Sequence, residues 1–169
     1  MAKRVSLCAI MVALALVFSY VEAMIPFNFG IPGIKLGIAN LVIVIGLYLL
    51  KPQDVLIISV VRILLAGFLF GSGMSILYSL AGGLLSFLVM FLLKKIKGFS
   101  VLGVSIAGGV SHNMGQLVVA AIVVSNLKIG YYTPVLLIAG AVTGTLIGIV
   151  SGRVLAAIKK EGKRAARED

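Results

Sequence analysis

The chain is a succession of long apolar runs, interrupted only by short charged or turn-forming segments. Its 169 residues are 61% hydrophobic and 12% charged, whereas a soluble domain is about 45–50% apolar and carries about twice this share of charge. A run of about 20 apolar residues is long enough for a helix to cross the hydrocarbon core of a bilayer. The sequence therefore predicts an all-α integral membrane protein with no room for a separate soluble domain.

Turn and charge signals divide the apolar sequence into six predicted transmembrane helices. Pro26 follows the first, Lys51 and Pro52 separate the second from the third, and Asp54 is expected to cap the third. The shorter spans leave open a segment that does not fully cross the membrane. The expected spans are about 5–24, 36–50, 53–71, 73–93, 100–124 and 131–158.

Basic residues are segregated along this pattern. With six crossings, the side that holds both termini collects Lys3, Arg4, Lys51, Lys94, Lys95, Lys97, Arg153, Lys159, Lys160, Lys163, Arg164 and Arg167. The opposite side holds only Lys35 and Lys128, with Arg62 unassigned. Because cytoplasmic loops concentrate Lys and Arg, we expect a multi-pass plasma-membrane protein with both termini cytoplasmic and no nucleic-acid partner. Residues 1–158 would form one six-helix transmembrane domain, and 159–169 a basic cytoplasmic tail.

Four polar residues stand at membrane depth in otherwise apolar segments. Arg62 lies in the third predicted span, and His112, Asn113 and Gln116 share one side of the fifth. A charge near the bilayer centre costs at least about 2.5–3.5 kcal/mol, so such residues usually face a protein interior or a water-filled site. Two interpretations stay open for them, namely internal pairing and contact with a ligand.

For Arg62, the internal alternative is an ion pair with Glu22 or a bond to backbone carbonyls. The ligand alternative is an anion, because a guanidinium holds carboxylate or phosphate groups through paired hydrogen bonds. Lys35 lies in the loop after the first span, where Pro32 and Gly33 favour a defined turn. That loop is either an ordinary connection or a lid whose Lys35 attracts an anion, with Asn40 one turn into the next helix.

Small residues recur at every fourth position, as in helices that pack closely within membranes. The sixth span carries such a glycine stripe, for which internal bundle packing is the simpler interpretation. Ala9 and Ala13 have the same spacing in the first span. This pair either packs inside the bundle or forms an outward docking face for a partner subunit. The glycines of the sixth span are Gly140, Gly144, Gly148 and Gly152.

Signals for catalysis by this chain alone are missing. The sequence has no nucleotide-binding GxxxxGK[ST] loop, no aspartate pair for Mg²⁺ on a diphosphate and no serine nucleophile motif. Outside the tail its carboxylates are Glu22 and Asp54, on opposite sides of the membrane. The lone Cys8 is a packing residue in the first span. We expect a protein that is not an enzyme and has no catalytic residue, metal site or cofactor.

The residues of three segments resemble those of a known family. They are IPGIKLGIANLVIVIGLYLLKPQDVLIISVVRILLAG, LYSLAGGLLSFLVM and GVSHNMGQLVVAAIVV, in this order. They are similar to the heptaprenyl diphosphate synthase component I family, which is also called the Gx transporter family. The resemblance extends over about residues 5–155. This family is grouped by similarity with the substrate-binding S components of energy-coupling factor (ECF) transporters.

The resemblance implies a six-helix S-component bundle that binds a micronutrient from outside and works with a transmembrane coupling subunit and two ATPases. Ala9 and Ala13 match the AxxxA pattern through which S components contact the coupling subunit. The loop over 26–35 matches the loop that closes over the ligand. Depth in the membrane, and no family motif, suggests that Arg62, His112, Asn113 and Gln116 line the pocket. Lys35, on the loop, and Asn40, one turn into the next helix, complete the predicted substrate-binding residues.

Other roles compatible with the resemblance remain open. The synthase label is at odds with the missing aspartate-rich motifs. A label without these motifs favours, as an alternative, a non-catalytic membrane component associated with prenyl diphosphate or quinone synthesis. A place in flavin- or quinone-linked electron transfer is a third hypothesis. The ligand stays open among a flavin, a thiamine-like precursor, a prenyl phosphate and a quinone precursor.

Overall fold

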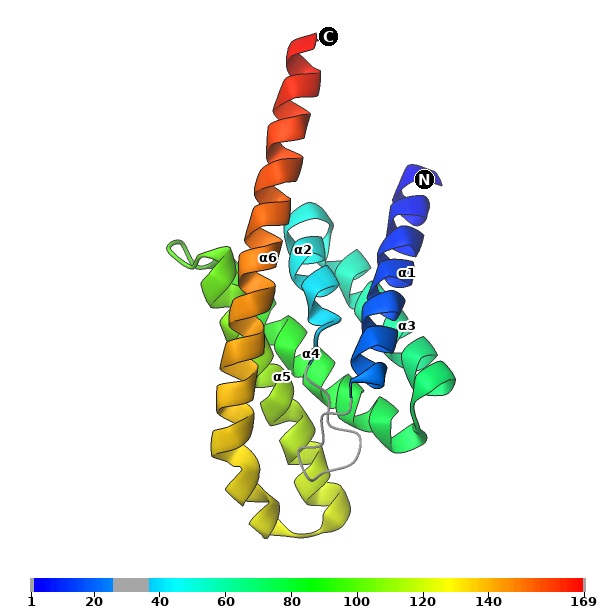
Figure 1. Ribbon diagram of the computed structural model, residues 1–169, viewed down its shortest axis with the longest axis vertical. Helices are drawn as coiled ribbons and strands as arrows, with labels where there is room; N and C mark the ends of the chain where they lie inside the picture. Colours follow the sequence, from blue (N-terminus) through cyan, green and yellow to red (C-terminus); the bar gives the residue numbers. More distant parts are fainter. Residues whose placement is uncertain (1, 26–36, 169) are drawn as a thin grey trace.

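Six α-helices and one short 3-10 helix form the regular structure of the computed structural model, which describes residues 2–25 and 37–168 (Figure 1). No strand occurs within these ranges, so the prediction of an all-helical protein is confirmed. The helices are α1 (Ala2–Met24), α2 (Asn40–Leu49), α3 (Pro52–Phe70), α4 (Gly73–Lys95), α5 (Val101–Val124), the 3-10 helix η1 (Leu127–Tyr132) and α6 (Thr133–Glu168).

Five of these helices, all except α2, are long and apolar enough to cross a membrane. The second predicted span, over 36–50, needs correction because its helix has only 10 residues. At 1.5 Å per residue it is about 15 Å long, roughly half the thickness of a hydrocarbon core. Gly37 adopts a φ of +82° and accepts a hydrogen bond from the N–H of Asn40 at 2.9 Å, so a tight turn precedes the helix. At the other end, Pro52 already begins α3.

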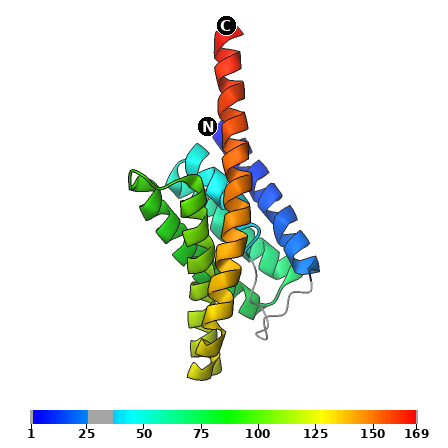
Figure 2. The same ribbon diagram turned by 60° about the vertical axis from the view of Figure 1, so that its left-hand side comes forward.

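The short helix α2 occupies the centre of the bundle. Residues 42–47 are all buried, and α2 contacts each of the five other α-helices. Figure 1 shows it between α1 and α3 on one side and α6 on the other, and in Figure 2 it lies directly behind α6. A helix that is apolar on every face is typical of a buried core element. The hydrophobic core accordingly forms around Val42, Ile43, Val44 and Leu47.

Both chain termini lie at the same end of the bundle (Figure 1). The α2–α3 connection, with Lys51, and the α4–α5 connection, with Lys97, also lie toward this end. The connection between α5 and α6, which contains Lys128, is at the opposite end. This arrangement agrees with an even number of passes. Helix α6 continues through the predicted tail as far as Glu168 and projects beyond the other helices.

Glycines allow α5 and α6 to approach at backbone contact. A Cβ atom on Gly140 would lie 2.7 Å from the carbonyl oxygen of Gly109, and one on Gly144 would lie 2.7 Å from that of Ser105. The Ser105 hydroxyl donates to the carbonyl oxygen of Gly144 at 2.7 Å. Internal packing of the glycine stripe is therefore confirmed from Gly140 to Gly148. It ends before Gly152, whose added Cβ would meet nothing within 4 Å.

Asp54 does not cap α3, contrary to the expectation from its position. The N-cap residue is Lys51, and no side chain caps this helix. Instead, both oxygens of the Asp54 carboxylate accept hydrogen bonds from Arg4, with a distance of 2.8 Å from Arg4 Nε to Asp54 Oδ2. This ion pair joins the start of α1 to the start of α3. The pairing depends on tertiary structure, so local sequence rules do not reveal it.

Candidate functional site

Arg62 is buried inside the bundle, with 5% of its surface exposed. Its Nη2 atom donates a hydrogen bond of 3.0 Å to Oδ1 of Asn40, the first residue of α2. Glu22, near the end of α1, attracts the guanidinium electrostatically. A charge at this depth is stable only with polar partners, and here they come from two different helices. Arg62 therefore has polar partners inside the protein, although its hydrogen bond goes to the side chain of Asn40, which the sequence did not indicate as its partner.

The turn before α2 brings a third segment to Arg62 and its partners. The N–H of Gly37 donates to Oε1 of Glu22. A Cβ atom on Gly37 would lie 3.1 Å from Nδ2 of Asn40 and 3.2 Å from Cδ2 of His112. Because its φ of +82° also disfavours side chains, this position requires glycine for both conformation and space. The turn thereby connects α1, α2 and α5.

His112 and Gln116 lie on the face of α5 that packs against α4. A Cβ atom on Gly82 of α4 would lie 2.6 Å from the His112 carbonyl oxygen and 2.9 Å from Cγ of Gln116. The two side chains are 2% and 0% exposed. We call Glu22, Asn40, Arg62, His112 and Gln116 the polar cluster. All five are buried, and they are connected through the Arg62–Asn40 bond and through contacts with Gly37 and Gly82.

Asn113 is directed toward a different neighbour. Its Nδ2 atom donates to the carbonyl oxygen of Leu136 on α6 at 2.9 Å. The three polar residues predicted on α5 are therefore divided between two contacts. His112 and Gln116 lie against α4, and Asn113 joins α5 to α6.

Some buried polar atoms in this region have no hydrogen-bond partner among the described residues. They are both amide atoms of Gln116, Nε of Arg62 and Oδ1 of Asn113. Leaving such a group unpaired costs roughly 1–3 kcal/mol, so most buried polar groups in proteins are paired. The unpaired set contains both donors and acceptors, which a bound polar molecule would satisfy.

The remaining predicted residues lie away from the polar cluster or outside the described part. Ala9 and Ala13 are exposed on α1, whereas Met11 and Ala15 of the same helix are buried. The pair is therefore available on the outer face, as a docking surface would require. Lys35 and the predicted lid over 26–35 lie outside the residues that the structure describes.

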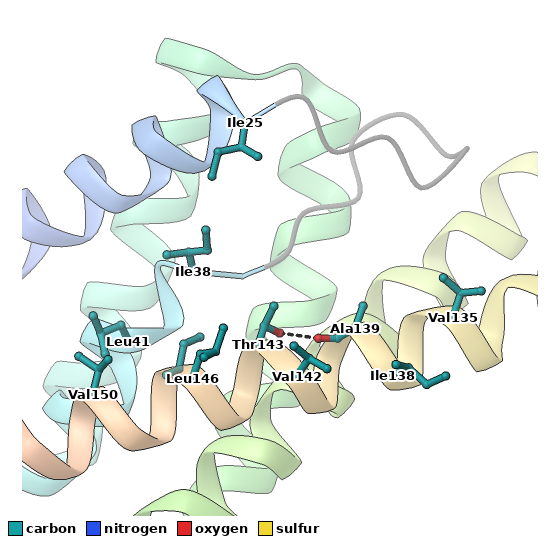
Figure 3. A pocket seen from close by; sticks show the side chains of 11 residues that line it. Ile25, Ile38, Leu41, Val135, Ile138, Ala139, Val142, Thr143, Leu146 and Val150 are labelled. Carbon is teal, nitrogen blue, oxygen red and sulfur yellow. Dashed lines mark hydrogen bonds between the residues drawn. The ribbon is translucent and has the colours of Figure 1, made fainter.

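A groove with a cavity volume of about 640 Å³ runs along α6 (Figure 3). This volume falls within the range of about 300–1,000 Å³ that is usual for ligand sites. Ten of its lining residues are apolar, and the Thr143 hydroxyl donates to the carbonyl oxygen of Ala139 at 2.9 Å. The lining residues are Ile25, Ile38, Leu41, Val135, Ile138, Ala139, Val142, Thr143, Leu146, Ile147 and Val150.

Sequence reasoning missed this groove and the role of Gly37. The groove residues of α6 recur at helical spacing, but lipid-facing residues follow the same apolar pattern. Nothing in the sequence separates the two. For Gly37, the available signal was a glycine three residues before a polar helix start at Asn40, which is consistent with a tight turn.

The polar cluster and the groove both fall within a region matched by a known family. The family model described as heptaprenyl diphosphate synthase component I matches residues 11–154. The chain belongs to this family. No curated protein and no solved structure matches it. Together with the five apolar helices, membership of the component I family supports a membrane component, and its name denotes one part of a multi-component system.

Proposed function

We propose that this component I family member is the substrate-binding S component of an ECF-type transporter that captures a small anionic solute from outside. The observation that supports this best is the polar cluster, with its unpaired buried atoms at Gln116 and Arg62. Arg62 would hold the anion, while Asn40, His112 and Gln116 would provide hydrogen bonds. Asn113 would contribute its unpaired Oδ1 atom, and Lys35 would lie on the loop that closes over the solute.

Energy for transport would come from partner subunits in this proposal. The sequence carries no nucleotide-binding loop, so a transmembrane coupling subunit and two ATPases would be required. Ala9 and Ala13 would form the docking face, because small exposed residues let a partner helix approach closely in a membrane. With both termini cytoplasmic, that end of the bundle would also face the ATPases.

Solute binding by Arg62→Ala tests the role of the polar cluster. The solute is first identified by mass spectrometry of small molecules that remain with the purified protein. We expect Arg62→Ala to abolish retention of that solute while the protein remains folded. Arg153→Ala is the matched control, because it removes the same charge from an exposed position on α6. Normal retention by Arg62→Ala would reject this site.

Affinity purification from the native membrane tests the partners. ATPase subunits that co-purify with the wild-type chain, and are lost when Ala9 and Ala13 are both replaced by Leu, would support the S-component role. The bulkier side chains would keep a partner helix at a distance. Replacement of Leu14 by Phe is the control, because Leu14 is exposed on a different side of the same helix. A prenyl synthase subunit in place of ATPases would reject the transporter.

A second function is favoured by the family name and by the groove. We also consider a non-catalytic membrane component associated with prenyl diphosphate or quinone synthesis. An apolar groove along α6 is suited to a prenyl chain, whereas a compact micronutrient does not require one. The same purification separates these two functions through the proteins that are recovered.

A further inference from the structure

We infer that the ligand is amphipathic, with an anionic head in the polar cluster and a single apolar chain in the groove along α6. This inference rests on the proposed function of the polar cluster as a ligand site. It adds the chemical class of the ligand, which neither the cluster nor the groove defines alone.

The groove and the polar cluster are formed in part by neighbouring residues of the same segments. Asn113 neighbours His112 on α5 and donates to the carbonyl oxygen of Leu136, and Leu136 lies between groove residues of α6. On the other side, Ile38 lines the groove. Its chain neighbour Gly37 approaches Asn40 and His112. Consecutive residues of this turn therefore face the two regions, Gly37 the cluster and Ile38 the groove.

The lining of the groove suits an apolar chain and does not suit a polar group. Its hydroxyl, on Thr143, already donates within α6. The α6 residues that line it run from Val135 to Val150, which corresponds to about 22 Å along the helix axis. Figure 3 shows them in a row that faces Ile38 and Leu41. A compact solute bound at the cluster would leave most of this length unused.

The depth of the cluster argues against an ordinary membrane phospholipid as the ligand. Arg62 is eight residues before the end of α3 at Phe70, which places it about 12 Å along the axis from that end. Phospholipid headgroups stay in the interfacial region outside the hydrocarbon core. A headgroup that reaches Arg62 must belong to a molecule that the protein takes out of the interfacial region. The single groove has room for one apolar chain.

Photo-crosslinking in lipid nanodiscs tests this inference. The probe is a C12 alkyl monophosphate that carries a diazirine near the end of its chain, and labelled peptides are located by mass spectrometry. We expect labels on α6 between residues 138 and 150, removed by excess unlabelled dodecyl phosphate. The corresponding alcohol, which lacks the anionic head, should label this segment roughly tenfold less, the loss typical of one missing hydrogen bond to a charged group.

A matched pair of variants separates the groove from general contact with lipid. Leu146→Trp fills the groove and should reduce labelling of α6 by the phosphate probe about tenfold or more, a loss of about 1.4 kcal/mol in binding. Ile149→Trp adds the same side chain three residues away, at an exposed position that does not line the groove. It should leave labelling unchanged.

The possible failures are distinguishable. Labelling spread evenly over all lipid-facing helices, or unaffected by Leu146→Trp, would overturn the inference about the chain and leave solute binding at the polar cluster standing. Labelling confined to the groove but equal for the phosphate and the alcohol would overturn the anionic head, and it would count against the proposed site as well. Inorganic phosphate that competes as well as dodecyl phosphate would show that the chain contributes nothing.

Discussion

Gly37 combines a left-handed backbone conformation with contact to the polar cluster. We predict that Gly37→Ala destabilises the protein by more than Gly98→Ala. Both glycines have positive φ, a conformation that costs a residue with a Cβ about 1–2 kcal/mol. At Gly37 the new Cβ would also press against Asn40 and His112, whereas at Gly98 it would meet nothing within 4 Å. Thermal unfolding in detergent measures the difference, and equal losses would contradict the described turn.

Gln116 and Asn113 lie one turn apart and should respond oppositely to replacement by leucine. Gln116→Leu removes two unpaired buried atoms, so we expect the protein without ligand to be unchanged or more stable, by about 1–3 kcal/mol. Asn113→Leu removes the hydrogen bond to Leu136 and should lower stability by about 1 kcal/mol. Chemical unfolding of both variants checks this. A stability loss in Gln116→Leu would show that its amide is paired within the protein.

Burial of the key polar residues was predictable from the sequence, but their partners were not. Arg62, His112, Asn113 and Gln116 stand out because a polar residue in an apolar span is costly unless it faces inward. Their division between Asn40, α4 and α6 depends on how the helices rotate and approach one another. Those rotations follow from glycine contacts between residues far apart in the sequence, such as Gly82 with His112.

At the scale of helices, the α5–α6 contact depends on glycines that allow the backbones to touch. We predict that Gly144→Ala destabilises the protein by about 1–3 kcal/mol, the usual cost of overpacking. Its new Cβ would lie 2.7 Å from backbone atoms of Ser105 and Ile106. In Gly152→Ala, on the same helix, the new Cβ would meet nothing within 4 Å. This variant should therefore stabilise the protein by up to about 1 kcal/mol. Thermal unfolding of the two variants tests the contact, since similar effects would exclude close packing at Gly144.

The sequence predicted the long helices well and the short one poorly. Spans such as 73–93 and 100–124 agree with α4 and α5 because Ser72 and Ser100 cap the starts of these helices with local hydrogen bonds. The start of α2 depends on the Gly37 turn, which the Glu22 carboxylate holds from another helix. Hydropathy alone extends the span because it does not detect such a turn.

For the whole molecule, the arrangement of helices gives a testable topology. In a Cys8→Ala background, we predict that Lys128→Cys reacts with a membrane-impermeant maleimide on intact cells. Lys97→Cys should react only after permeabilisation. Both side chains are exposed and lie in connections at opposite ends of the bundle, and the more basic end is expected inside. The reverse labelling pattern would invert the orientation and reject solute capture from outside.

The central position of α2 has a consequence for how the protein is made. This helix emerges from the ribosome second, yet it packs against α6, which is synthesised last. With about 15 Å of helix, it is too short to be held across the bilayer by its own length. During synthesis, α2 therefore completes its packing only after α6 has been made. Chains truncated before α6 should accordingly be recognised by membrane quality-control proteases, even though every earlier helix is present.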